Sequence, residues 1–141
     1  MTGPPSHPKP SQVTDVYWLY AAGPRGRWPE SAERVGKWLV FVSAEHVDAV
    51  WARIQQATEA GRLGIAAKVA TARPNPNATS RDSRVICIDT YDCEDEADVM
   101  RVRGELRRLG IARKIPYKTD ADTLAGKYSA RGDTQIARYF A

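Results

Sequence analysis

Lys68 lies in the middle of a predicted strand, and it is the side chain of this sequence that points most clearly to chemistry. Its neighbours Ala67 and Val69 are apolar, and a lysine is unusual on a strand unless its face is solvated or lines a pocket. Arg73 and Arg81 bracket the proline- and asparagine-rich loop that follows. Because a guanidinium can donate two parallel hydrogen bonds to phosphate, these cations predict a site for a phosphorylated ligand. Lys68 would be the central cation, or the general base if a reaction occurs.

More cationic and aromatic residues lie where predicted strands end. The segment 115–129 adds two lysines, two tyrosines and several hydroxyl groups. The predicted ligand contacts outside the Lys68 strand and its loop are Lys37, Trp28, Tyr117, Lys118 and Lys127. A solvated loop that caps a short helix explains the same polar residues, so both interpretations stay open.

The tryptophans support an alternative, which is nucleotide or RNA binding on one face of a sheet. Trp18 and Trp28 lie in or near loops, where an aromatic ring can stack on a base. Either ring could instead cover the sheet, whereas Trp38 and Trp51 lie at predicted core positions. A third possibility is a protein-interaction module, which would have no pocket with converging cations.

Several kinds of site are disfavoured by the sequence. It contains no G-x-S-x-G, Walker or G-x-G-x-x-G pattern, and its two histidines and two cysteines have no metal-ligand spacing. We therefore expect no metal and no cofactor. Four arginines of a predicted helix, at positions 101, 103, 107 and 108, are interpreted as ordinary solvent-exposed residues.

Composition predicts a small protein with acidic partners. The chain has 141 residues and a net charge of +4, which mildly favours phosphates or nucleic acid. Residues 1–12 contain four prolines and predict a disordered tail, followed by a single domain over 13–141. The sequence shows no apolar run long enough to span a membrane and no signal peptide, so we expect a cytoplasmic protein without a membrane partner.

Hydrophobic periodicity predicts the elements that position these residues. Strands are expected at 16–20, 37–42, 65–72, 84–91, 113–117 and 135–140, with 113–117 at an edge because of Pro116. One helix should be capped by Ser43 and end at Gly61, a second should run from Asp92 to Gly110, and a short third is expected at 119–124. Each long helix has one apolar stripe, so the fold class is α+β, with an antiparallel sheet and two main helices on one face.

Four stretches of sequence resemble a known family. They are Lys37-Trp38-Leu39-Val40-Phe41, Gly64-Ile65-Ala66-Ala67-Lys68-Val69, Val85-Ile86-Cys87-Ile88-Asp89-Thr90-Tyr91-Asp92, and Tyr117-Lys118-Thr119-Asp120 through Gly126-Lys127-Tyr128. They resemble the family of basophilic leukaemia-expressed proteins over about two thirds of the chain. The resemblance implies the fold of the mRNA-cap-binding initiation factor, which is a curved antiparallel sheet backed by helices.

A more distant similarity is to bacterial phosphothreonine lyases. These pair a lysine base with a histidine acid and hold phosphate with arginines, and the strand of Lys68 is similar to the one that carries their base. Leu39 stands where their Lys-x-His pattern places the acid, and leucine cannot protonate a leaving phosphate. The resemblance therefore implies phosphate binding by Lys37, Lys68, Arg73 and Arg81, of a small molecule, a peptide or a nucleotide, and leaves catalysis open.

Overall fold

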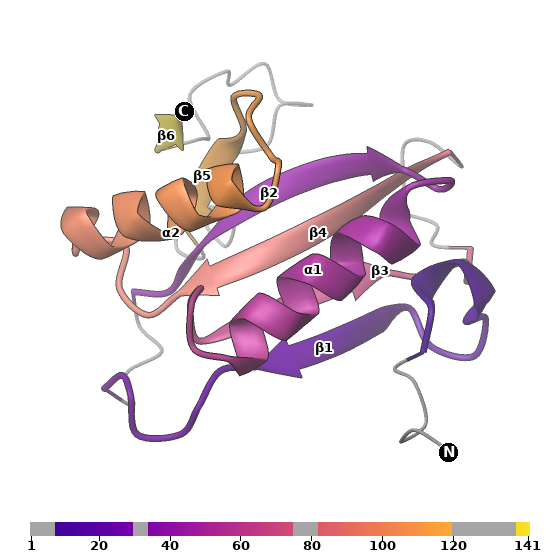
Figure 1. The fold of residues 1–141 in the computed structure, drawn as a ribbon, viewed down its shortest axis with the longest axis horizontal. Helices are drawn as coiled ribbons and strands as arrows, with labels where there is room; N and C mark the ends of the chain where they lie inside the picture. Colours follow the sequence, from indigo (N-terminus) through magenta and orange to yellow (C-terminus); the bar gives the residue numbers. More distant parts are fainter. Residues whose placement is uncertain (1–7, 30–33, 75–81, 120–137) are drawn as a thin grey trace.

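A curved antiparallel sheet with both long helices on one face makes up the fold (Figure 1). The computed structural model describes residues 8–29, 34–74, 82–119 and 138–141. The strands are β1 (Trp18–Ala22), β2 (Gly36–Ser43), β3 (Ala66–Ala70), β4 (Ser83–Thr90), β5 (Pro116–Thr119) and β6 (Tyr139–Phe140), in the order β1-β3-β4-β2-β5-β6. The helices are α1 (Val47–Glu59) and α2 (Glu96–Arg108). The predicted α+β class is confirmed.

β2 lies inside the sheet, as its apolar composition predicts. It pairs with β4 along its whole length, from Gly36 opposite Thr90 to Ser43 opposite Ser83, and with β5 on its other side. Side chains alternate between the two faces of a strand, so a strand buried on both faces is apolar at consecutive positions.

α1 covers the sheet with the predicted stripe but begins later than expected. Val47, Trp51 and Ile54 are buried, and Gly61 ends the helical segment with a φ of +80°. The prediction that Ser43 caps this helix is wrong, because the β ladder continues through Ser43 and the helix starts at Val47.

α2 also packs as predicted, and it starts at Glu96, four residues after the expected Asp92. The carboxylate of Asp95, the N-cap, accepts a hydrogen bond from the backbone N–H of Asp98 at 3.1 Å. Val99, Val102 and Leu106 are buried. A carboxylate at this end both satisfies a free N–H group and interacts favourably with the helix dipole.

Arg103 of α2 is buried, so its interpretation as a solvent-exposed residue is wrong. Its side chain is 3 % exposed, and its guanidinium donates to the carbonyl oxygens of Ile111, Arg113 and Ala141 at 2.9, 2.6 and 2.9 Å. These bonds tie the segment after α2 and the end of β6 to the helix. Burial of a charged group is tolerated when its donors are satisfied in this way.

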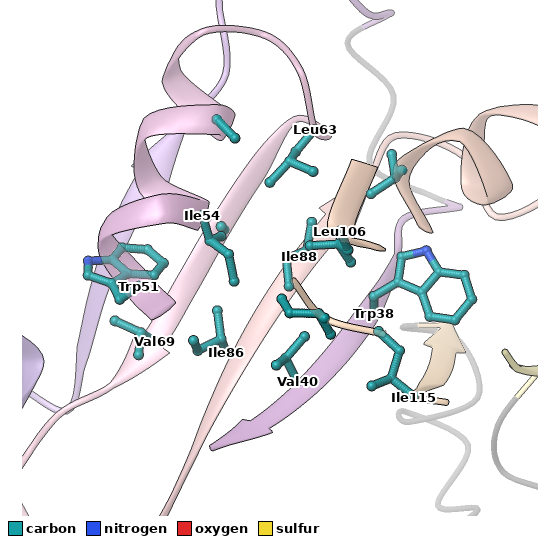
Figure 2. Packing of buried hydrophobic residues seen from close by; sticks show 14 of the residues in the cluster. Trp38, Val40, Trp51, Ile54, Leu63, Val69, Ile86, Ile88, Leu106 and Ile115 are labelled. Atoms are coloured by element: carbon teal, nitrogen blue, oxygen red, sulfur yellow. The ribbon is translucent and has the colours of Figure 1, made fainter. Parts of the chain in front are cut away.

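The core lies between the helices and the sheet (Figure 2). Trp51 and Ile54 of α1 face Val69 and Ile86, while Leu106 of α2 and Trp38 of β2 fill the other half. The indole N–H of Trp38 donates to the carbonyl oxygen of Val99 in α2 at 3.0 Å.

The structure corrects two further predictions, one about β5 and one about residues 8–12. β5 is not an edge strand, because β6 pairs with it and bonds join Ile115 and Ala141 in both directions. Residues 8–12 are not a disordered tail: Pro10–Gln12 form a 3-10 turn with Pro10 buried, and the backbone N–H of Ser11 donates to Asp48 of α1 at 2.9 Å. Residues 1–7, 120–124 and 135–137 lie outside the part of the chain that the structure describes.

Candidate ligand-binding face

The sheet face opposite the helices carries Lys37, Lys68 and Lys118, three of the six predicted ligand contacts that the structure describes. Strand register brings Tyr20, Lys68, Cys87 and Leu39 into one row across β1, β3, β4 and β2. The next row contains Ala66, Asp89, Lys37 and Lys118. We call the face formed by these two rows and Trp18 the open face, since the helices cover the other side.

A shallow hollow of about 190 Å³ lies in the open face. It is lined by Tyr20, Lys37, Ala66, Ala67, Lys68 and Asp89, which come from β1, β2, β3 and β4. The alanines leave room between the longer side chains. Lys37 and Lys68, which are distant in sequence, therefore converge on one site.

Lys118 adds a third cation beside the hollow. It is the register partner of Lys37 on β5 and is partly buried. Burial lowers the pKa of Lys118 from its usual value, and the positive charge of Lys37 lowers it further. A positive charge held close to another, with reduced access to water, favours the approach of an anion.

Two aromatic rings border the cations. The Nζ atom of Lys68 lies 4.3 Å from the ring centroid of Trp18, within the range of a cation–π interaction. Tyr20, opposite Lys68 on β1, is 69 % exposed. An exposed ring beside a cationic hollow could stack on a planar group of a ligand.

Arg73 lies apart from this group of lysines. It follows the end of β3 by three residues, stacks over Tyr17 with Cζ 4.5 Å from the ring centroid, and donates to the carbonyl oxygen of Asp15 at 3.0 Å. These contacts hold its guanidinium against the segment before β1.

Tyr117 is not a ligand contact of this face, so that prediction is corrected. It alternates with Lys118 on β5 and is fully buried against Trp38 and Tyr139. Its hydroxyl lies 2.6 Å from that of Thr90, and burial raises its pKa.

Trp28 is partly buried, in the loop after β1. Its ring packs against Gly23, where an added Cβ would lie 2.8 Å from a ring carbon. Arg81 and Lys127, two other predicted contacts, lie outside the described part of the chain.

Tyr20 and Asp89 are lining residues that the sequence prediction missed. Asp89 follows the apolar run Val85-Ile86-Cys87-Ile88 near the end of β4, and a carboxylate at such a position was a signal of a polar site. Neither residue could be matched to Lys68 without the strand register.

The described residues include neither a metal-binding cluster nor a membrane-spanning helix. Over 8–29, 34–74, 82–119 and 138–141, no group of three or more histidine, cysteine, aspartate or glutamate side chains could hold a metal ion. Over those ranges, no helix is both long and apolar enough to cross a bilayer.

A family model matches residues 29–125, more than half of the chain, and it describes basophilic leukemia-expressed protein Bles03. The chain belongs to the Bles03 family. The matched range contains Lys37, Lys68, Asp89 and Lys118, whereas Trp18 and Tyr20 of β1 precede it.

Solved structures similar to this Bles03-family chain share its fold. They include schistosome eIF4E complexed with m7GpppA and 4E-BP, and schistosome eIF4E complexed with m7GpppG and 4E-BP. Each has a TM-score of 0.66 and 19% sequence identity, over 96% of this chain and 76% of the other. The predicted similarity to the cap-binding fold is confirmed, and at this identity it concerns the fold alone.

Proposed function

We propose that the open face binds the phosphate group of a phosphorylated ligand. The observation that carries the proposal is the convergence of Lys37 and Lys68 on one hollow. Two ammonium groups can donate several charge-assisted hydrogen bonds to phosphate oxygens. Lys118 stands beside Lys37 and adds a third positive charge.

The size of the hollow limits what enters it. Its volume of about 190 Å³ is below the roughly 300–1,000 Å³ of pockets that enclose drug-sized ligands. A phosphate group would occupy the hollow while the rest of the ligand lies across the open face. Asp89, inside the hollow, would repel excess negative charge and could accept a hydrogen bond from the ligand.

A nucleotide is the specific candidate for that ligand. Tyr20 and Trp18 place aromatic rings next to Lys68, where a base could stack while its phosphate contacts the lysines. The likeness to eIF4E structures solved with m7GpppA and m7GpppG adds limited support. RNA binding through a terminal or unpaired nucleotide would use the same contacts.

Phosphothreonine lyase activity stays a hypothesis supported by the place of Lys68 in the hollow. In such a reaction Lys68 would take the α-proton, the Cβ–O bond would break, and phosphate would leave with the bonding electrons. The departing phosphate needs a proton donor, and Leu39 supplies none. Binding without catalysis is therefore the function we propose.

Ligand titration followed by tryptophan fluorescence and calorimetry tests this proposal. The probes are inorganic phosphate, a phosphothreonine peptide, AMP and m7GpppG. Replacing one contacting lysine, as in Lys37→Gln or Lys68→Gln, should weaken binding about ten- to hundredfold, because a hydrogen bond to a charged group contributes about 1.5–3 kcal/mol. Mass spectrometry of the peptide detects any loss of phosphoric acid.

Arg25→Gln is the matched control, since Arg25 is an exposed cation in the loop after β1 and is not among the residues that line the hollow. It should leave affinity unchanged. An equal loss in this control would show that only net charge matters and would refute the site. Failure of all four probes to bind would refute the proposal as a whole.

A further inference from the structure

A second concentration of positive charge surrounds the C-terminal end of α2, on the helix-bearing side of the sheet. We call it the arginine cluster, and it consists of Arg53, Arg103, Arg107, Arg108, Arg113 and Lys114. All of these except Arg103 are solvent-exposed. They come from α1, from α2 and from the segment between α2 and β5.

Backbone carbonyl groups hold the guanidinium groups of the cluster. Arg53 donates to the carbonyl oxygen of Leu109 at 3.4 Å, and Arg107 donates to that of Ala112 at 3.3 Å. Arg113 donates to the carbonyl oxygen of Phe41 in β2. Each of these exposed arginines makes one such bond, which leaves others of its five donors for a ligand.

The charge of the cluster is poorly compensated. Arg108 pairs with Glu105 at 3.5 Å, and within the described part of the chain no carboxylate pairs with Arg53, Arg107 or Arg113. Arg53, Arg107 and Arg113 therefore contribute three positive charges that no carboxylate of the described residues offsets.

The lowered pKa of Arg103, the buried member of the cluster, agrees with this excess of positive charge. Burial lowers the pKa of Arg103, and the positive charges of Arg107 and Arg113 lower it further. The three guanidinium groups are therefore close enough to repel one another, and an external polyanion would relieve that repulsion.

The side chains that the cluster exposes favour a nucleic acid over an acidic protein as its partner. Ile111 is buried beneath the cluster and Leu109 is partly buried, so charged side chains dominate what the cluster exposes. Protein interfaces draw most of their energy from a few anchors, chiefly tryptophan, tyrosine and arginine, seated in well-packed pockets, and the cluster includes neither tryptophan nor tyrosine. Nucleic acids bind chiefly through phosphate contacts with arginine and lysine.

We propose that the arginine cluster binds the phosphodiester backbone of a nucleic acid, on the side of the molecule opposite the open face. The site is independent of the lysines of the hollow. It would bind without base specificity, because it offers cations to phosphates and exposes no aromatic ring for stacking among its six residues.

Fluorescence anisotropy of a labelled oligouridine, titrated at several salt concentrations, tests this proposal. The triple variant Arg53→Gln, Arg107→Gln, Arg113→Gln should bind at least about tenfold more weakly. The slope of log K against log salt is negative, and in this variant it should become shallower by about 2. Each lost contact with a phosphate of a single strand reduces the magnitude of the slope by about 0.7. A labelled RNA duplex, measured in parallel, shows which form of the backbone binds better.

Three controls separate charge at this site from other causes. The triple replacement of the same arginines by lysine keeps the charge and should keep most of the salt slope. The double variant Lys9→Gln, Arg25→Gln removes exposed cations elsewhere and should retain binding. In the Lys37→Gln, Lys68→Gln background, the triple replacement of the arginines by glutamine should still change the salt slope by about 2, because the contacts of the cluster are separate from those of the hollow.

Three results would overturn the proposal. The first is a salt slope that the glutamine triple leaves unchanged. The second is a loss in the lysine triple as large as in the glutamine triple, which would indicate a structural effect of the arginines. The third is tighter binding of a polyglutamate peptide than of either RNA, which would assign the cluster to an acidic protein.

Discussion

Replacing Lys118 with methionine should stabilise the unliganded protein and weaken the phosphate binding proposed for the open face. Lys118 and Lys37 are register partners on β5 and β2. Like charges directly opposite on neighbouring strands are destabilising, by about 0.2–1 kcal/mol on the scale of cross-strand pairs. Lys118→Met removes that repulsion and keeps an apolar side chain of similar length, so the free energy of unfolding should rise by this amount.

The pH dependence of the effect follows from the lowered pKa of Lys118. A lysine whose pKa is lower in the folded state than in the unfolded state destabilises the fold at pH values where both states are protonated. That cost is relieved as the pH rises through the folded-state pKa. The advantage of Lys118→Met should therefore be full near neutral pH and shrink in the alkaline range.

Thermal unfolding followed by circular dichroism, together with the ligand titration, measures both halves of this prediction. The expected rise in Tm is about 1–4 °C, and the expected loss of affinity for phosphate-bearing probes is about ten- to hundredfold. Lys118→Arg is the control: because it keeps the charge, its rise in Tm and its loss of affinity should both be smaller than those of Lys118→Met. A lower Tm for Lys118→Met, or unchanged affinity with a raised Tm, would refute the reasoning about this pair.

Other predictions concern packing, buried donors and titration. Gly36→Ala should cost about 1–3 kcal/mol in thermal unfolding, because its Cβ would lie 2.1 Å from the Tyr117 hydroxyl, whereas Gly104→Ala, with open space around it, should gain about 0.5–1 kcal/mol. Arg103→Met should lose at least about 3 kcal/mol in urea unfolding, because three carbonyl groups lose their donor. The tyrosinate absorbance of Tyr91 should titrate near pH 12, because its hydroxyl donates to the carboxylate of Asp95, the N-cap of α2. The free energy of unfolding that this bond contributes should be present below pH 10 and lost as the pH rises towards 12. Tyr91→Phe should abolish that titration, and a titration near pH 10 would contradict the assignment.

Much of the fold could be predicted because it depends on local patterns. The apolar stripes of α1 and α2 and the doubly apolar β2 each indicate which surface is buried, and the two helices then need one sheet face to cover. Arg103 was misjudged although a signal existed. It lies four residues after Val99 and three before Leu106, so it belongs to the buried stripe.

The candidate site could be predicted only in part, because it depends on register. Tyr117 and Lys118 are adjacent, and a shift of one residue exchanges the faces on which they lie. Turn geometry and the pairing of β2 with β5 decide which one joins Lys37, and neither can be judged from composition. Arg73 was grouped with Lys68 by distance along the chain, but its guanidinium is held by the segment before β1.

The position of β1 at the edge of the sheet has a consequence for ligand preference. Within the described part of the chain β1 pairs with β3 alone, and it carries both aromatic rings of the open face, whereas the three lysines lie on strands further in. An edge strand can change its sequence with less effect on neighbouring strands than an interior one. Under the proposed function, substitutions in β1 would alter which group is recognised next to the phosphate without changing the strands that carry the lysines. Exchange of β1 with that of a homologue would then change the ligand preference of this chain.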